Sequence, residues 1–335
     1  MDVCRNAWKV LLLLAVSVAP GRLVAAADQP LALAQGDRIV LIGNTLAERM
    51  QHNGYWETLL HSRFPDSQLV VRNLGWSADE LTIRLRSKDF KDHGHNLTDH
   101  KPDVILAFFG FNESFAGDAG LPKFRADLEK FIQETTTTKY NGQQPPQLVL
   151  VSPIANEDLP QRNLFAGKRN NDNIAKYTEA MRQVAEAKGI KFVDLFAPTL
   201  KLMQSGQQPL TFNGIHLTDH GYERLAPVLD EALFGPRNTP AGSAELRAAV
   251  NEKNLQFWYD HRAVNGFYIY GGRKAHFGVV NFPEEFKKLR KMIANRDQRV
   301  WQVAQGKPVP EKIDDSQTGD LPSVATNIKF EVNLT

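Results

Sequence analysis

The feature that most constrains the fold is an alternation of short, continuously apolar segments with helical segments along residues 38–233. The apolar segments are residues 39–42, 69–74, 104–109, 147–152 and 190–194. Strands that are buried on both faces carry apolar residues at successive positions, as these segments do. Residues 172–188 have apolar side chains spaced by three and four, and Gly189 follows them as a helix stop. The alternation predicts an α/β domain with a parallel sheet covered by helices on both faces.

Small or polar residues follow three of the predicted strands directly. Gly43-Asn44-Thr45-Leu46 follows the first strand, Gly75 follows the second, and Gly110-Phe111-Asn112-Glu113 follows the third. A fourth segment, Phe212–Tyr222, contains His216 and precedes the closing helix of the domain. Ligands bind beyond the carboxyl ends of the strands in open α/β sheets, so we expect these segments to form one site.

The order and content of these four segments resemble the SGNH (GDSL-type) hydrolase family over roughly residues 36–235. In that family a Gly-Asp-Ser nucleophile turn is followed by a lone Gly, by Gly-x-Asn-Asp and by Asp-x-x-His. This chain has Thr45 in place of the nucleophilic Ser and Asn213 in place of the triad Asp. The resemblance implies a three-layer, flavodoxin-like parallel sheet, and hydrolysis of ester bonds without a cofactor. Carbohydrate O-deacylation is one reaction of that class.

The resemblance also implies a role for each site residue. Thr45 would attack the ester, His216 would take its proton, and Asn213 would hold the imidazole. The backbone N–H groups of Thr45 and Gly75, with the Asn112 amide, would bind the oxyanion. The Thr methyl restricts χ1 and crowds the intermediate. In a Ser-His-Asp triad, Asn in place of Asp costs about 10⁴ in kcat. The alternative is therefore a catalytically silent protein that keeps the fold and binds a glycan or an ester.

Each of these residues also has a structural interpretation. Thr45 with Glu48 three residues later is typical of a helix capping box, and His216 alone would be an ordinary loop histidine. Asn112 and Gly75 are residue types that stabilise tight turns. Glu48 and Asp79 are the carboxylates near these segments that would replace the missing acid.

A polar segment after the second strand is rich in histidine and aspartate, but the spacing fits no familiar metal site. We interpret it as solvated surface and expect no metal. The residues are Asp92, His93, His95, Asp99 and His100.

Residues 1–27 have the features of a secretory signal peptide. Arg5 and Lys9 precede the apolar run 10–16, which is too short for a transmembrane anchor, and Ala25–Ala27 provides a cleavage site. Cleavage would remove Cys4, the single cysteine, so we expect an exported bacterial protein, periplasmic or secreted, that folds without disulfides. The formal net charge of +2 gives no reason to expect nucleic acid or an anionic membrane as a partner.

We divide the mature chain into an α/β domain (28–235), a helical appendage (236–305) and a linker or tail (306–335). Helices predicted at residues 243–260 and 283–305 flank an aromatic, Gly-rich connection. Aromatic residues are expected to attach the appendage to the domain: Phe257, Trp258, Phe267 and Tyr270. A polar set offers the alternative of covering the pocket mouth: Arg262, Asn265, Tyr268 and Arg273.

Overall fold

A computed structural model describes residues 29–84, 95–164, 167–262 and 282–320 of the chain. The predicted signal peptide and the end of the predicted tail lie outside these residues. Among the helices of the described part, none is long and apolar enough to cross a membrane.

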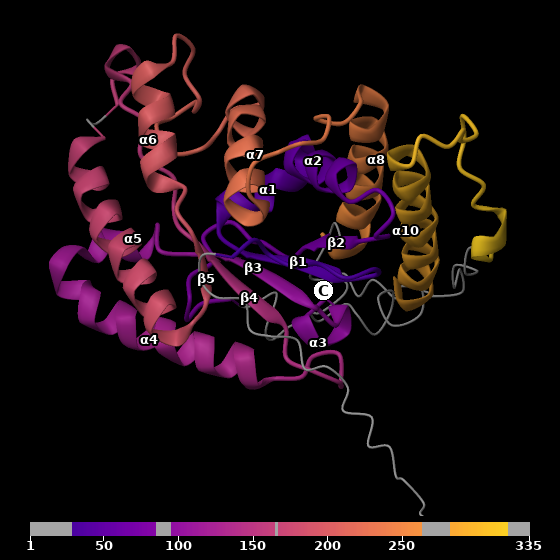
Figure 1. The fold of residues 1–335 in the computed structure, drawn as a ribbon, viewed down its shortest axis with the longest axis horizontal. Coiled ribbons are helices and arrows are strands. Elements are labelled where there is room, and N and C mark those ends of the chain that lie inside the picture. The colour runs from indigo at the N-terminus through magenta and orange to yellow at the C-terminus, as the bar shows by residue number, and fades with distance from the viewer. Residues whose placement is uncertain (1–28, 85–94, 165–166, 263–281, 321–335) are drawn as a thin grey trace, which may run out of the picture.

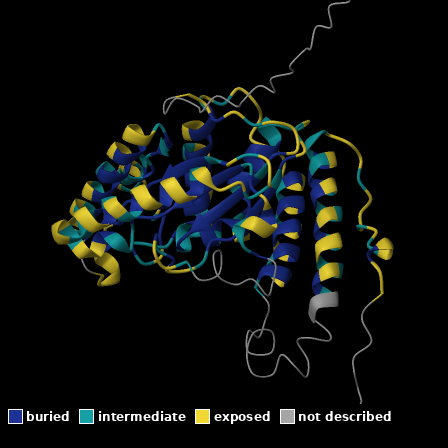
Figure 2. Cartoon of the chain, turned by 90° about the horizontal axis from the view of Figure 1, so that it is seen from below, coloured by how far each residue is buried: buried dark blue, intermediate teal, exposed yellow. Residues whose placement is uncertain are grey.

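Five parallel strands form one sheet with the order β2-β1-β3-β4-β5. The strands are β1 (Arg38–Gly43), β2 (Val70–Asn73), β3 (Val104–Phe108), β4 (Gln147–Val151) and β5 (Lys191–Val193). Every residue of the central strand β3 is buried, and Figure 2 shows the sheet buried between layers whose outer surfaces are exposed. This order is the flavodoxin-like one, so the predicted three-layer fold is confirmed.

Helices cover both faces of the sheet (Figure 1). One face is packed by α1 (Thr45–Asn53), α2 (Tyr55–Arg63) and α7 (Asp219–Phe234), and the other by α4 (Gly117–Thr137) and α5 (Lys168–Lys188). Ile39 and Leu41 of β1 face the first layer, whereas Val40 and Ile42 face the second. Successive side chains of a strand point to opposite faces, so the continuous apolar run buries both. The remaining elements of the domain are α3 (Leu97–His100), α6 (Phe196–Ser205) and the 3₁₀ helices η2 (Glu113–Ala116) and η3 (Pro160–Arg162).

A glycine separates α1 from α2, where the sequence predicted an interruption. Gly54 has φ +66°, in the left-handed region that favours glycine. A Cβ at this position would lie 2.2 Å from Asn251 Oδ1. The turn therefore needs glycine both for its backbone conformation and for the close approach of the appendage.

The appendage covers the edge of the sheet at β2. Its helices α8 (Ala244–His261) and α10 (Phe282–Ala304) pack side by side next to that strand (Figure 1). Lys253 Nζ donates to the carbonyl of Val71 at 3.3 Å, and Trp301 Nε1 donates to that of Leu69 at 2.9 Å. These side chains supply the hydrogen bonds that a further strand would make, which protects the edge. The predicted helical C-terminal extension is confirmed.

Buried ion pairs join the appendage to the α/β domain. Arg72 of β2 binds Asp297 of α10, with Nη1 3.0 Å from Oδ1. Lys253 of α8 binds Glu57 of α2 at 2.5 Å. Removing one partner of a buried pair leaves an uncompensated charge, so the two helices are integral to this edge of the sheet.

Part of the predicted tail is also packed. Residues 307–320 include the 3₁₀ helix η5 (Ser316–Thr318), which contacts α10. Asp315 accepts from Arg296 of α10 at 3.0 Å. The described half of this segment is thus tied to the appendage by an ion pair, which its polar composition did not indicate.

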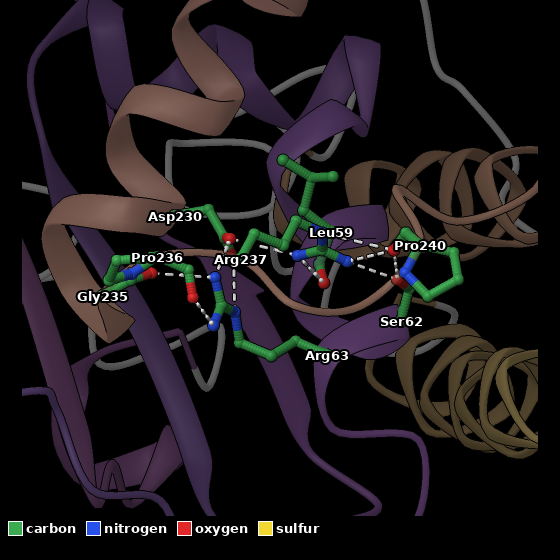
Figure 3. A network of polar contacts seen from close by, with 8 residues as sticks. All are labelled: Leu59, Ser62, Arg63, Asp230, Gly235, Pro236, Arg237 and Pro240. Carbon is green, nitrogen blue, oxygen red and sulfur yellow. Dashed lines mark hydrogen bonds and ion pairs between the residues drawn. The ribbon is translucent and has the colours of Figure 1, made fainter.

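A second ionic network fixes the crossing from the domain to the appendage (Figure 3). The side chain of Asp230 on α7 is fully buried, and Oδ2 lies 2.6 Å from Arg63 Nη2 and 3.1 Å from Arg237 Nη1. The same arginines donate to the carbonyls of Gly235 and Leu59. One carboxylate therefore holds α2, α7 and the connecting segment together.

Candidate active site

The candidate site lies at the carboxyl ends of β1 and β3. The chain leaves these neighbouring strands in opposite directions across the sheet, which is the topological switch point where α/β folds bind ligands. A pocket of about 250 Å³ opens there. Four residues of its lining are polar amides, hydroxyls or imidazole: Asn44, Thr45, Asn112 and His216. The others are largely apolar: Leu46, Ala78, Phe111, Phe115, Pro153, Ile154, Ile215, Leu217 and Tyr222.

Thr45 begins α1, and Asn44 is the residue that caps this helix. Asn44 Oδ1 accepts the backbone N–H of Leu46 at 3.1 Å. The interpretation of Thr45 and Glu48 as a capping box is therefore wrong, because the cap lies one residue earlier. The Glu48 carboxylate instead accepts from Ser77 Oγ at 3.0 Å. The Thr45 side chain is not used as the cap and lines the pocket.

The turn that presents Thr45 requires a glycine before it. Gly43 has φ +127°, and a Cβ there would lie 2.1 Å from the carbonyl oxygen of Phe108. Asn44 N–H donates to the same carbonyl at 3.2 Å. The chain thus passes directly over the end of β3, which brings the first turn of α1 close to the loop that carries Asn112.

A buried carboxylate positions the His216 loop. Glu157 accepts the N–H groups of Leu210 and Thr211 at 2.9 and 2.7 Å, and its own N–H donates to the carbonyl of Gly214 at 2.8 Å. Sequence reasoning missed Glu157, because nothing near it in the sequence distinguishes it from a surface acid. Its partners lie more than fifty residues away.

Asn213 contacts the His216 imidazole through both atoms of its amide. His216 Nδ1 lies 3.0 Å from Asn213 Nδ2 and 3.2 Å from Oδ1. Oδ1 also accepts the backbone N–H of His216 at 2.9 Å, which identifies the oxygen end of the amide. If Nδ2 donates to Nδ1, the imidazole proton sits on Nε2; if Oδ1 accepts from Nδ1, Nε2 is free to act as a base. A carboxylate would allow only the second arrangement.

The surroundings of His216 disfavour its protonated form. Burial lowers its pKa below the ordinary value, the nearby Arg49 lowers it further, and Glu48 partly opposes this. Phe212 stacks on the imidazole with ring centroids 5.6 Å apart, and the Arg49 guanidinium lies over the Phe212 ring. Thr45 and His216 line the same pocket, although within the described residues no hydrogen bond joins them.

The two predicted oxyanion residues differ in their surroundings. Asn112 lines the pocket, and Glu113 beside it fixes the loop by accepting the N–H groups of Gly110 and Leu81 at 2.9 and 3.0 Å. Gly75 lies outside the described pocket lining, and its N–H donates to Asn73 Oδ1 at 2.9 Å. A Gly75 oxyanion role would therefore require that hydrogen bond to be exchanged.

The carboxylates considered as replacements for the missing acid are both near the site. Glu48 influences the His216 pKa through its charge. Asp79 follows Ala78 of the pocket lining, and burial raises the Asp79 pKa to about 7. In the described part of the chain, neither forms a hydrogen bond with His216. Ala78 has φ +67°, a strained conformation for a residue with a Cβ.

The interpretation of the histidine-rich segment as solvated surface is wrong for His95 and His100. Both are buried under α8, and His95 Nδ1 lies 3.0 Å from His100 Nε2. His95 Nε2 lies 3.2 Å from the carboxylate of Asp260. No group of three or more potential metal ligands occurs among residues that can be described. Asp92 and His93 lie outside them.

The polar and aromatic residues of the appendage have separate roles where they are described. Arg262 stacks on Trp76, 3.0 Å from the ring centroid, and Nη2 donates to the carbonyl of Gly75 at 3.0 Å. It thus supports the segment after β2. Phe257 is buried in the core between the appendage and the domain, as expected of an attachment residue. Trp258 of α8 packs edge-on against His52 of α1, with ring centroids 4.7 Å apart, which also attaches the appendage to the domain. The other candidates lie outside the described residues: Asn265, Phe267, Tyr268, Tyr270 and Arg273.

Comparison with known proteins identifies the family to which the chain belongs. The chain belongs to the GDSL-like Lipase/Acylhydrolase family, whose sequence profile matches residues 36–224. No curated protein matched the sequence. Among solved structures, the chain is similar to Axe2, an acetylxylan esterase from Geobacillus stearothermophilus, at 17% identity and a TM-score of 0.48, over 63% of this chain and 98% of that one. It is also similar to a gut microbial diltiazem-metabolizing enzyme at 20% identity and a TM-score of 0.48, over 62% and 49% of the two chains.

Proposed function

We propose that this protein is an exported ester hydrolase that uses Thr45 as nucleophile and His216 as general base. The observation that supports the proposal is that Thr45, Asn112 and His216 line a single pocket while Asn213 contacts the far side of the imidazole. Family membership makes hydrolysis of an ester the reaction to test first.

In the proposed reaction, Thr45 Oγ1 attacks the ester carbonyl carbon while its proton passes to His216 Nε2. The Asn112 amide and the Thr45 N–H would stabilise the oxyanion, since the first N–H groups of a helix have no intrahelical partner. Collapse of the tetrahedral intermediate releases the alcohol, which takes the proton from His216. Water, activated by His216, then hydrolyses the acyl-threonine and regenerates the hydroxyl.

The reaction should be slow compared with that of a complete triad. Asn213 has no charge with which to stabilise the imidazolium formed after proton transfer. Both Nδ2 and Oδ1 of its amide also lie within hydrogen-bond distance of Nδ1, so the imidazole can adopt the tautomer that has its proton on Nε2 and no basic nitrogen toward Thr45. That observation supports the second candidate function, a protein that binds a glycan or an ester without hydrolysing it. That the alcohol part of the ester is a carbohydrate remains a prediction.

A fluorophosphonate probe separates the two functions, because it labels an activated hydroxyl covalently. We expect mass spectrometry to find the label on Thr45 and to find it lost in Thr45→Val, which keeps the shape of the side chain. Hydrolysis of p-nitrophenyl acetate should fall in the same variant. If the folded wild-type protein takes up no label and hydrolyses the ester no faster than Thr45→Val, the proposed enzyme is excluded and the binding function is retained.

A further inference from the structure

The pocket is mainly apolar apart from the groups assigned to the reaction. Outside Thr45, Asn112 and His216, the lining amide is Asn44, whose Oδ1 is already bonded to Leu46 N–H. The Tyr222 hydroxyl is also engaged, donating to the carbonyl of Leu46 at 3.1 Å. A sugar enclosed here would lose water from several hydroxyls and find few partners among the described residues, which is unfavourable.

Apolar side chains from three separate segments form the wall. Ile154 follows β4, Leu217 belongs to the His216 loop, and both are almost completely buried. Phe111 and Phe115 lie on the Asn112 loop in edge-to-face contact, with ring centroids 5.4 Å apart. Phe115 lines the pocket and is 58% exposed, so it lies where the pocket meets the solvent.

The size of the pocket exceeds that of an acetyl group. An apolar cavity of about 150 Å³ holds one benzene ring. A pocket of about 250 Å³ therefore has room for roughly ten non-hydrogen atoms on the same scale. The few non-hydrogen atoms of an acetyl group would fill only a minor part of it and leave much of the apolar wall in contact with water.

We propose that the pocket binds the acyl part of the ester, and that it selects medium-length apolar acyl groups of roughly six to nine carbons over acetyl. The alcohol part, which a sugar can supply, then lies outside the pocket. The inference rests on the proposed ester hydrolysis and specifies its substrate class. Each methylene buried in the pocket should strengthen binding about fourfold.

Binding can be tested without hydrolysis by using 2-alkanones, which retain the carbonyl and the acyl chain but have no ester bond. Titration of the full chain with the series from acetone to 2-undecanone should give a Kd that falls about fourfold per methylene and then levels off near the predicted length. Ile154→Phe adds volume to the wall, so it should move this limit to shorter chains. A second variant, Phe115→Ala, removes an exposed aromatic side chain from the wall. Its matched control is Tyr259→Ala, since Tyr259 is 51% exposed on α8 and lies outside the described lining.

The outcomes separate the inference from the proposed function. A Kd independent of chain length, or a limit unchanged in folded Ile154→Phe, overturns the acyl pocket. So does hydrolysis of p-nitrophenyl acetate with a kcat/KM equal to that of the hexanoate. Length-dependent ketone binding with no hydrolysis of any ester overturns the proposed enzyme and retains an apolar ligand pocket. Phe115→Ala, which shortens the wall at the surface, should weaken the longest ketones most, and an equal loss for all lengths contradicts its place in the wall.

Discussion

Replacing Asn213 by Asp tests the central weakness of the candidate triad. In the variant, one carboxylate oxygen would keep the hydrogen bond that the backbone N–H of His216 donates at 2.9 Å. The other would take the place of Nδ2, 3.0 Å from His216 Nδ1. This second oxygen can only accept, so the Nδ1 proton becomes fixed and Nε2 becomes the basic nitrogen. The substitution needs no change in the loop, because Asp and Asn have the same shape.

The magnitude follows from the charge that is introduced. Two unit charges about 4 Å apart attract by about 4 kcal/mol at an effective dielectric constant of 20. His216 is half-buried, so solvent reduces this. We therefore expect the Asn213→Asp variant to raise the His216 pKa by about one to two pH units relative to the parent. Asn163→Asp provides the control, since Asn163 is exposed and the same charge is added there.

The assay has a spectroscopic part and a kinetic part. Imidazole NMR measures the His216 pKa and tautomer in both variants. Because triad members act as a unit, the rate is best tested in Thr45→Ser/Asn213→Asp, which also removes the methyl crowding. We expect this double variant to hydrolyse p-nitrophenyl acetate at least ~10²-fold faster than the parent, and His216→Ala in the same background to abolish the gain. A folded double variant with the raised pKa but the parental rate would refute the assignment of Thr45 as nucleophile.

Three further predictions concern stability and export. Asp79 has an ordinary pKa near 3.8 and a folded-state pKa of about 7, so its burial destabilises the fold increasingly from pH 3.8 to 7. Asp79→Asn should therefore leave urea unfolding unchanged at pH 3.5 and stabilise the protein by about 1–2 kcal/mol at pH 8, and an equal effect at both would contradict this. Asp230→Ala removes the buried partner of two arginines and should cost about 3–5 kcal/mol by urea unfolding, whereas Asp118→Ala at an exposed pair should cost at most ~1 kcal/mol. N-terminal sequencing of the exported protein should begin at or next to Asp28, and retention of residues 1–27 would contradict the predicted signal peptide.

The sheet was predictable from the sequence because its strands are buried on both faces. Their continuous apolar runs placed all five strands to within a few residues, whereas the strand order that creates the switch point was implied by the family resemblance. Helix α6 was not predicted from the sequence, and Pro198 lies near its beginning. Proline is tolerated in the first turn of a helix, where its missing N–H would have no intrahelical partner. The run Phe196–Ser205 therefore continues as a helix through a residue that usually signals a loop.

The burial of His95 and His100 was not predictable, because it depends on a helix distant in sequence. Both histidines lie in a segment that is polar along its length, and local composition therefore favoured a solvated surface. In the fold, Phe257 of α8 packs edge-on against both rings, and the carboxylate of Asp260 reaches His95. Burial and neighbouring charges lower the pKa of His100 well below its ordinary value, so it stays neutral. Tertiary contact, not residue type, decides the environment of these two side chains.

In the candidate site, too, the sequence indicated which residues take part but not how their side chains are arranged. The sequence indicated that Thr45 follows the end of a strand and that His216 precedes the closing helix, and the two residues line one pocket. It did not indicate that Asn44 would be the cap, which depends on the turn made by Gly43 over Phe108. Nor did it reveal that Asn213 could approach the imidazole with either end of its amide. An amide can donate as well as accept, so the tautomer of His216 depends on a balance between two hydrogen bonds of similar length. The hydrogen bond that Asn213 makes with His216 therefore bears on whether the pocket can hydrolyse a ligand, together with the missing charge at position 213 and the methyl group of Thr45.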